Sequence, residues 1–135
     1  MKTSKYIWIC LFAVIGVVLV LSSSCKKNDD PSVPVFTITA DSVMLQGGGS
    51  GLQFFAKCTN ENVKMTEVKI TSPTPAQTMT YSLNGGTFNK NAEFSLQDDN
   101  TAYYKELGTW NFTFVGTLTA DNSSFSVDAT LSITE

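Results

Sequence analysis

The sequence predicts an all-β domain that folds as an antiparallel β-sandwich of about seven short strands. Sixteen threonines follow Cys25, together with many Val, Ile, Phe and Tyr residues, and strands favour these residue types. No stretch longer than ten residues spaces its apolar side chains as a helix would, whereas several short runs alternate apolar and polar residues. Turn-forming residues separate these runs every 8 to 15 residues or so, a spacing that suits a sandwich better than a barrel.

The chain begins with a segment typical of exported proteins. A short basic start containing Lys2 and Lys5 precedes an uncharged apolar run over residues 6–21. This run is shorter than the roughly 20 apolar residues that a membrane-spanning helix needs. We therefore expect residues 1–24 to be a signal peptide, and a short membrane anchor is the alternative.

Small residues connect the apolar run to a cysteine. The sequence Ser22-Ser23-Ser24-Cys25 resembles the lipobox of bacterial lipoproteins, although the aliphatic Leu21 lies one position before the place where that motif has one. The resemblance implies cleavage before Cys25, a diacylglycerol on its sulfur and an acyl chain on its new amino group. Two or three acyl chains hold a protein stably on a bilayer. We therefore expect lipidation of Cys25 to attach the protein to a membrane.

Residues 25–34 are expected to be the lipidated cysteine and a flexible tether, because they are mostly polar and end with two prolines. Two lysines followed by two aspartates resemble a signal that sends lipoproteins of some Gram-negative bacteria to the outer face of the outer membrane. A solvated run of charges is the alternative. Residues 35–135 then supply about 100 residues, enough for one domain and too few for two.

The first half of the domain contains four candidate strands. The stretch Gly47-Gly48-Gly49-Ser50-Gly51 separates the first two strands, and Pro73-Thr74-Pro75 ends the third. Within the third, the apolar residues change from odd to even positions near Thr66, which suggests a bulge. We expect the first strand to stop at Asp41-Ser42 and to resume weakly beyond it. We also expect Asn84-Gly85-Gly86 to form a tight turn that ends the fourth strand. The apolar positions that mark these strands are Phe36, Ile38 and Ala40; Leu52, Phe54, Ala56 and Cys58; Val68 and Ile70; and Met79, Tyr81 and Leu83.

The last third of the chain is predicted to be a long hairpin, preceded by a short strand at Phe94 and Leu96. Trp110, Phe112 and Phe114 alternate with smaller or polar residues. After a polar turn, five apolar residues over 125–133 alternate with polar ones. One face of this hairpin is therefore expected to be buried, and the other face to be exposed to solvent.

Two segments resemble bacterial immunoglobulin-like domains. The final hairpin, from Gly108-Thr109-Trp110-Asn111-Phe112-Thr113-Phe114 to Leu131-Ser132-Ile133-Thr134, is similar to their last two strands, and residues 52–70 are similar to their second and third. The resemblance implies an immunoglobulin-like sandwich over residues 35–135, whose function ranges in that family from spacer to adhesin to glycan binder. The disulfide common in such domains is not expected, because Cys58 has no second cysteine on the strand of Trp110.

The composition excludes several kinds of chemistry. The chain has no His, and its nine positive residues are all Lys. It therefore lacks an imidazole base, a His-bearing metal site, a Ser-His-Asp or Cys-His arrangement and a bidentate Arg clamp for phosphate. A net charge of −3 and a pI of about 4.8 argue against a nucleic acid partner. We expect no enzymatic activity, no cofactor and no nucleic acid binding.

Tyr103 and Tyr104 are the candidate ligand-binding residues. They lie in a predicted loop beside Asp98-Asp99-Asn100, where two adjacent aromatic residues of an extended segment cannot both face inward. The alternative is that one tyrosine packs inside and the other is exposed by chance. Trp110 could be a sugar-stacking platform, but its parity with the neighbouring phenylalanines favours the core. Cys58 is likewise predicted to be a buried thiol and not a reactive one.

The remaining polar candidates are weaker. Asp98-Asp99-Asn100 and Asp121-Asn122 offer oxygen ligands, but neither has the one-three-five spacing of a calcium loop, so we expect no metal site. Acid–base catalysis would need paired carboxylates from Glu93, Asp98, Asp99 or Glu106 to meet in a cleft, which their spacing does not suggest. Asp41-Ser42-Val43 resembles a short O-glycosylation signal that some of the same bacteria use on exported proteins, so Ser42 is a candidate for that modification.

Together these observations predict a non-enzymatic lipoprotein of the cell envelope, held in the outer membrane and exposed at the cell surface. Its domain is expected to act as a protein-interaction or structural module. A carbohydrate-binding module of a polysaccharide-uptake system is the alternative. An enzyme is the third class considered.

Overall fold

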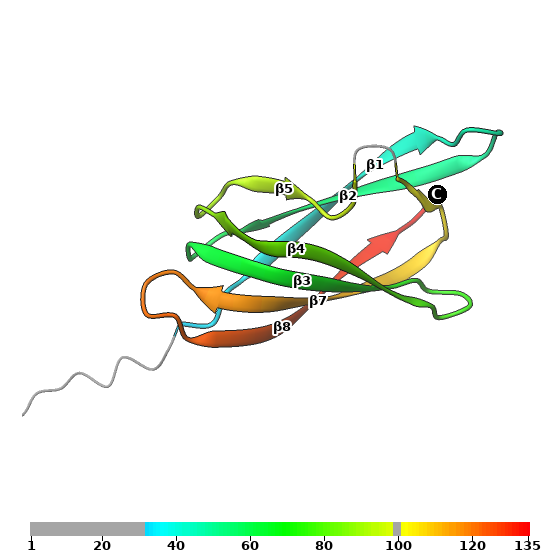
Figure 1. The fold of residues 1–135 in the computed structure, drawn as a ribbon. Coiled ribbons are helices and arrows are strands. Elements are labelled where there is room, and N and C mark those ends of the chain that lie inside the picture. Colours follow the sequence, from blue (N-terminus) through cyan, green and yellow to red (C-terminus); the bar gives the residue numbers. More distant parts are fainter. Residues whose placement is uncertain (1–31, 99–100) are drawn as a thin grey trace, which may run out of the picture. The chain divides into compact units, whose positions relative to one another are not determined.

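The computed structural model describes residues 32–98 and 101–135, so the predicted signal peptide, Cys25 and most of the tether lie outside the described residues. Within them, eight strands form two antiparallel sheets that pack face to face (Figure 1). The predicted all-β sandwich is confirmed. The strands are β1 (Phe36–Met44), β2 (Ser50–Cys58), β3 (Val63–Thr71), β4 (Thr78–Phe88), β5 (Glu93–Ser95), β6 (Tyr103–Tyr104), β7 (Gly108–Leu118) and β8 (Ser124–Ile133).

The strand order is that of an immunoglobulin-like sandwich. One sheet has the order β1-β2-β5, with β6 also paired to β2, and the other has the order β4-β3-β7-β8. In such sandwiches one sheet contains the first two strands and a later one. The opposite sheet contains the third strand and the last two strands, and it can gain a further strand. Here β4 is that added strand. The described residues form one strand more than the predicted count of about seven, because Tyr103 and Tyr104 pair with β2 where a loop was expected.

Alternation along the strands builds the core between the sheets. The largest side chains that are fully buried there include Trp110, Phe54, Phe112 and Phe114. Trp110 is only 1% exposed, and its indole Nε1 donates a hydrogen bond of 3.1 Å to the Glu106 carbonyl oxygen. Cys58 is a free thiol, also 1% exposed. The predictions that Trp110 and Cys58 belong to the core are therefore confirmed.

A bulge in β3 occurs where the change of parity predicted it. The register of β3 shifts between Met65 and Glu67 against both β4 and β7. Thr66 is thus the extra residue that lets Val63 and Met65 face the core together with Val68 and Ile70. The third strand ends at Thr71, shortly before Pro73, as predicted.

Two predicted breaks are wrong. Asp41 and Ser42 do not stop β1, because they pair in unbroken register with Gln53 and Leu52 of β2, and this pairing outweighs their poor strand preference. Asn84-Gly85 does not end β4 either. These two residues have positive φ angles of 50° and 72°, but the segments on both sides of them pair with β3 and not with each other, so they form an irregularity within one strand. Among residues 32–98 and 101–135 no helix is long and apolar enough to span a membrane.

Candidate functional site

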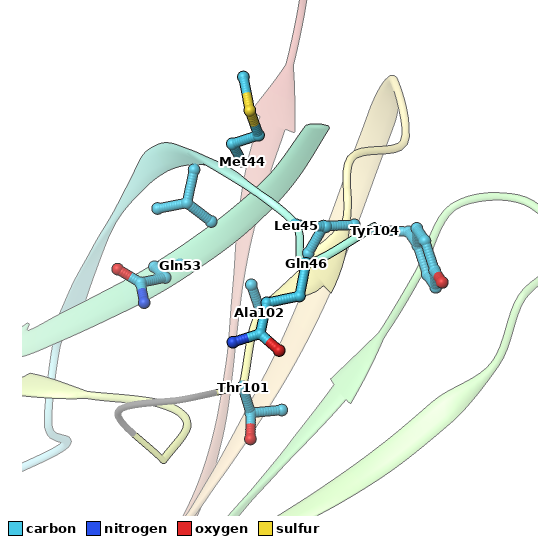
Figure 2. A pocket seen from close by; sticks show the side chains of 8 residues that line it. Met44, Leu45, Gln46, Gln53, Thr101, Ala102 and Tyr104 are labelled. Carbon is cyan, nitrogen blue, oxygen red and sulfur yellow. The ribbon is translucent and has the colours of Figure 1, made fainter. Parts of the chain in front are cut away.

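A hollow of about 480 Å³ lies at one end of the sandwich, where the β1–β2 hairpin meets the segment that contains β6 (Figure 2). A second hollow of about 190 Å³ adjoins it, and Thr101, Ala102 and Tyr104 line both. Figure 2 shows Tyr104 at the rim of the larger hollow, with its ring directed away from Gln53. The residues that line the larger hollow are Val43, Met44, Leu45, Gln46, Gln53, Thr101, Ala102 and Tyr104.

The hairpin side of the hollow is shaped by glycine. Gly47, Gly48 and Gly49 have φ angles of 105°, 90° and 103°, a region that residues with a Cβ rarely adopt. Their turn is closed by hydrogen bonds of 3.1 Å from the Leu45 amide to the Gly49 carbonyl oxygen and from the Gly48 amide to the Leu45 carbonyl oxygen. The turn leaves the side chain of Met44 88% exposed beside the hollow.

Strand pairing gives Tyr103 and Tyr104 opposite environments. Both pair with the start of β2, opposite Leu52 and Gly51, and adjacent residues of a strand face opposite sides. Tyr103 turns inward, where its ring centroid lies 5.5 Å from that of Phe54 and its hydroxyl donates a hydrogen bond of 3.3 Å to the Leu96 carbonyl oxygen. Tyr104 turns outward and is 76% exposed. The structure therefore makes Tyr104 the tyrosine that a ligand can reach.

The Gln97 side chain completes the edge of β2 between β5 and β6. Its Oε1 accepts a hydrogen bond of 2.9 Å from the Phe54 amide, while the Phe54 carbonyl oxygen accepts one of 2.9 Å from the Leu96 amide. Gln97 is 4% exposed, and its Nε2 has no hydrogen-bond partner in the part of the chain that the structure describes. Nothing in the pattern around Gln97 predicts this role, because a side chain here acts in place of a backbone group.

Burial of Tyr103 changes the acidity of its hydroxyl. Burial first, and then the neighbouring Tyr81 and Asp98, raise the pKa of Tyr103 from 10.0 to about 12. A phenol is protonated at neutral pH even at the ordinary pKa, so the raised pKa only widens the pH range over which Tyr103 can donate its hydrogen bond. The Tyr81 hydroxyl in turn donates a hydrogen bond of 3.2 Å to Asp98 Oδ1.

The groups around the larger hollow suit recognition by hydrogen bonds and ring contacts. Gln46 and Gln53 each carry an amide that can both donate and accept, and Thr101 carries a hydroxyl. Tyr104 adds an exposed aromatic ring at the rim. Among the described residues, no charged side chain lines the larger hollow. The arrangement can therefore hold an uncharged polar or amphipathic surface.

The other predicted site residues lie elsewhere or have partners of their own. Ser42 is exposed on β1, which leaves its hydroxyl accessible to a modifying enzyme. Glu106 Oε2 accepts a hydrogen bond of 3.1 Å from the Thr74 amide. Cys25, Asp99 and Asn100 lie outside the described residues. Within the described ranges, no three His, Cys, Asp or Glu side chains are grouped so that they could hold a metal ion.

Comparison with known proteins gives no family. The chain matches no protein-family model, no curated protein and no solved structure. Its class, an immunoglobulin-like antiparallel β-sandwich, is defined by strand order and pairing alone.

Proposed function

We propose that this protein is a lipoprotein of the cell envelope, anchored through Cys25 in the outer membrane and exposed at the cell surface. Its sandwich acts as a non-enzymatic protein-interaction or structural module. The partner contacts the end of the domain that carries Tyr104 and the larger hollow.

The observation that carries this proposal is the distance between the two ends of β1. Ser32, Val33 and Pro34 lie beside the turn between β7 and β8, where they line a third hollow with residues 123–127. β1 then extends over nine residues to Met44 at the larger hollow, a length of about 30 Å at about 3.3 Å per residue. Ser32, the first described residue, therefore lies at the end of β1 opposite to Tyr104, and this separation supports a partner surface at the end where the chain does not enter the domain.

The exposed side chains at that end favour a protein partner. Met44 and Tyr104 are 88% and 76% exposed, and both lie on the larger hollow. Tyr and Met are enriched at protein interfaces, because they bury apolar surface while Tyr also keeps a polar group. Exposed Met and Tyr side chains of this kind fit a shallow partner surface, and the described residues that line the hollow include none of the convergent acidic or basic groups that acid–base catalysis uses.

Site-specific photo-crosslinking tests the proposal. A photoreactive amino acid replaces Tyr104 in the full chain, expressed in its own cells, and a matched variant carries it at Val35, which is 54% exposed near the opposite end. We expect one discrete adduct with another protein from position 104 and none from position 35. Equal adducts from both positions, or none from position 104, would contradict the proposal.

A neutral polysaccharide is the second candidate ligand, because of one specific arrangement. Tyr104 lines both hollows, and Gln46, Gln53 and Thr101 also line the larger one. An exposed ring can stack on a sugar while amides and hydroxyls bind its hydroxyl groups. Under this alternative, Tyr104→Ala abolishes retardation of the full chain in a polysaccharide-containing gel, and Val35→Ala does not. Absence of retardation for the unmodified chain across a panel of neutral polysaccharides would exclude it.

A further inference from the structure

One short stretch of β4 lies outside the ladder that joins this strand to β3. The register pairs the two strands up to Ser82 and again from Gly86, and none of residues 83–85 has a partner in this register. Asn84 and Gly85 have φ angles of 50° and 72°, and two successive positive φ angles are typical of the centre of a tight turn. The chain therefore makes a tight turn inside the strand, with Asn84 and Gly85 at its centre.

The two residues at the centre of this turn form a reactive sequence. A backbone amide nitrogen can attack the side-chain amide carbon of the asparagine that precedes it. Glycine hinders this attack least, because it has no Cβ. The chain contains Asn-Gly only at residues 84 and 85. Asn84 is exposed, so the turn also gives the reaction the access to water that it needs.

The hydroxyl of Ser82 holds the Asn84 side chain by its oxygen. It donates a hydrogen bond of 3.0 Å to Asn84 Oδ1 and accepts one of 3.4 Å from the Asn84 amide. A donor on Oδ1 draws electrons away from Cγ, and it stabilises the negative charge that this oxygen gains when a nucleophile adds to Cγ. Ser82 therefore activates the carbon atom that the next amide nitrogen would attack.

We propose that Asn84 is a modification site, at which the folded protein loses the side-chain amide without an enzyme and with assistance from Ser82. The Gly85 amide nitrogen gives its proton to water and forms a bond with Asn84 Cγ. The bond between Cγ and Nδ2 breaks, and this nitrogen takes up a proton and leaves as ammonia. Water then opens the five-membered imide, which gives aspartate or, when the other carbonyl is attacked, isoaspartate.

The turn can accommodate either product. Aspartate visits the left-handed region as asparagine does, so it can keep the φ angle of residue 84. Isoaspartate lengthens the backbone by one carbon where no pair of the ladder is broken. The new negative charge forms next to Lys64, whose Cε lies 3.2 Å from the position of a Cβ at Gly85. The modification changes the surface charge of the folded domain as the protein ages, and it requires neither the anchor nor the partner proposed above.

Peptide mass spectrometry of the full chain, kept folded in mildly alkaline buffer, tests the proposal. Loss of the amide replaces NH2 with OH, and one digest measures it at Asn84, Asn91 and Asn122. The last two are matched controls, because they are exposed with φ angles of 64° and 59° but precede Ala92 and Ser123. We expect Asn84 to react at least tenfold faster than either control. Equal rates at the three positions, or no reaction at Asn84, would overturn the proposal.

A serine variant separates the effect of the folded geometry from that of the sequence. Ser82 is exposed, so Ser82→Ala should fold, which its melting temperature checks. We expect the variant to react at least threefold more slowly at Asn84 when folded, and at the unmodified rate in urea, where the hydrogen bond is absent. Thr80→Ala, which removes an exposed hydroxyl from the same face of β4, should leave the rate unchanged. An unslowed reaction in folded Ser82→Ala, or the same slowing in urea, overturns the proposal.

Isoaspartate provides an independent measurement. An isoaspartate carboxyl methyltransferase transfers a methyl group to this product, so the stored full chain should accept more methyl label with time. Asn84→Gly has no amide to lose at this position and keeps a residue that adopts positive φ angles readily. We expect at least tenfold less label on this variant than on the unmodified chain. Equal labelling of the two chains would place the isoaspartate elsewhere and overturn the proposal.

Discussion

At the scale of single residues, Tyr103 and Tyr104 show how pairing with a neighbouring strand gives two identical adjacent residues different environments. Their adjacency predicts that only one can face inward, but the sequence cannot tell which one. The choice depends on the register of β6 against Leu52 and Gly51, far away in the chain. Trp110 and Cys58 were easier to predict, because each lies in a longer run whose alternation defines the core face.

The raised pKa of Tyr103 predicts a loss of stability at high pH. Below pH 10 the phenol is neutral in both the folded and the unfolded chain, so it does not change the free energy of unfolding. Between pH 10 and about 12 the unfolded chain ionises first, so the free energy of unfolding should fall over that interval. Urea unfolding at a series of pH values measures it. Tyr103→Phe, which cannot ionise, should lose this part of the decline, and an unchanged decline would show that Tyr103 is not its source.

At the scale of strands, the bulge in β3 determines which residue the neighbouring strand can carry. Gly116 pairs with Met65 next to the bulge, and a Cβ at Gly116 would overlap the Lys64 carbonyl oxygen and come within 3.0 Å of the Phe125 ring. The backbone of β3 cannot move aside without breaking its pairing. Only glycine therefore allows β3 and β7 to approach this closely.

Gly116→Ala should therefore reduce the free energy of unfolding by about 1 to 3 kcal/mol, the usual cost of an atom forced into a packed site. Denaturant unfolding measures this loss. Gly51→Ala is the matched control, because its added Cβ would meet mainly the Leu45 side chain, which can rotate away. We expect a smaller loss for Gly51→Ala, and an equal or larger one would argue against backbone crowding at Gly116.

Strand positions could be predicted where local alternation and turns determine them, and not where distant pairing does. The final hairpin and the bulge at Thr66 follow from parity alone. Asn84-Gly85 has the sequence of a turn, but both of its flanks find hydrogen-bond partners on β3. The role of Gln97 depends on a gap between two short strands, which only the folded chain creates.

At the scale of the whole molecule, the proposed function depends on a lipid that holds one end of the domain. Cys25→Ala should leave the protein uncleaved or free of the membrane, because the acyl chains supply the attachment. Cell fractionation with metabolic palmitate labelling measures both effects. Ser24→Ala is a suitable control, since it keeps the thiol and a small residue before it. Palmitate labelling that persists in Cys25→Ala would exclude the lipobox.

The three glycines at the tip of the β1–β2 hairpin also affect how this protein can evolve. A side chain at Gly47, Gly48 or Gly49 would have open space around it, but the positive φ angles strain any residue that carries a Cβ. Met44 and Gln46, just before the turn, have exposed side chains and no such restriction on their φ angles. The tip therefore conserves its shape through residues without side chains, while the residues beside it can change. Under the proposed function, substitutions at Met44 and Gln46 would change what this end binds without rebuilding the loop.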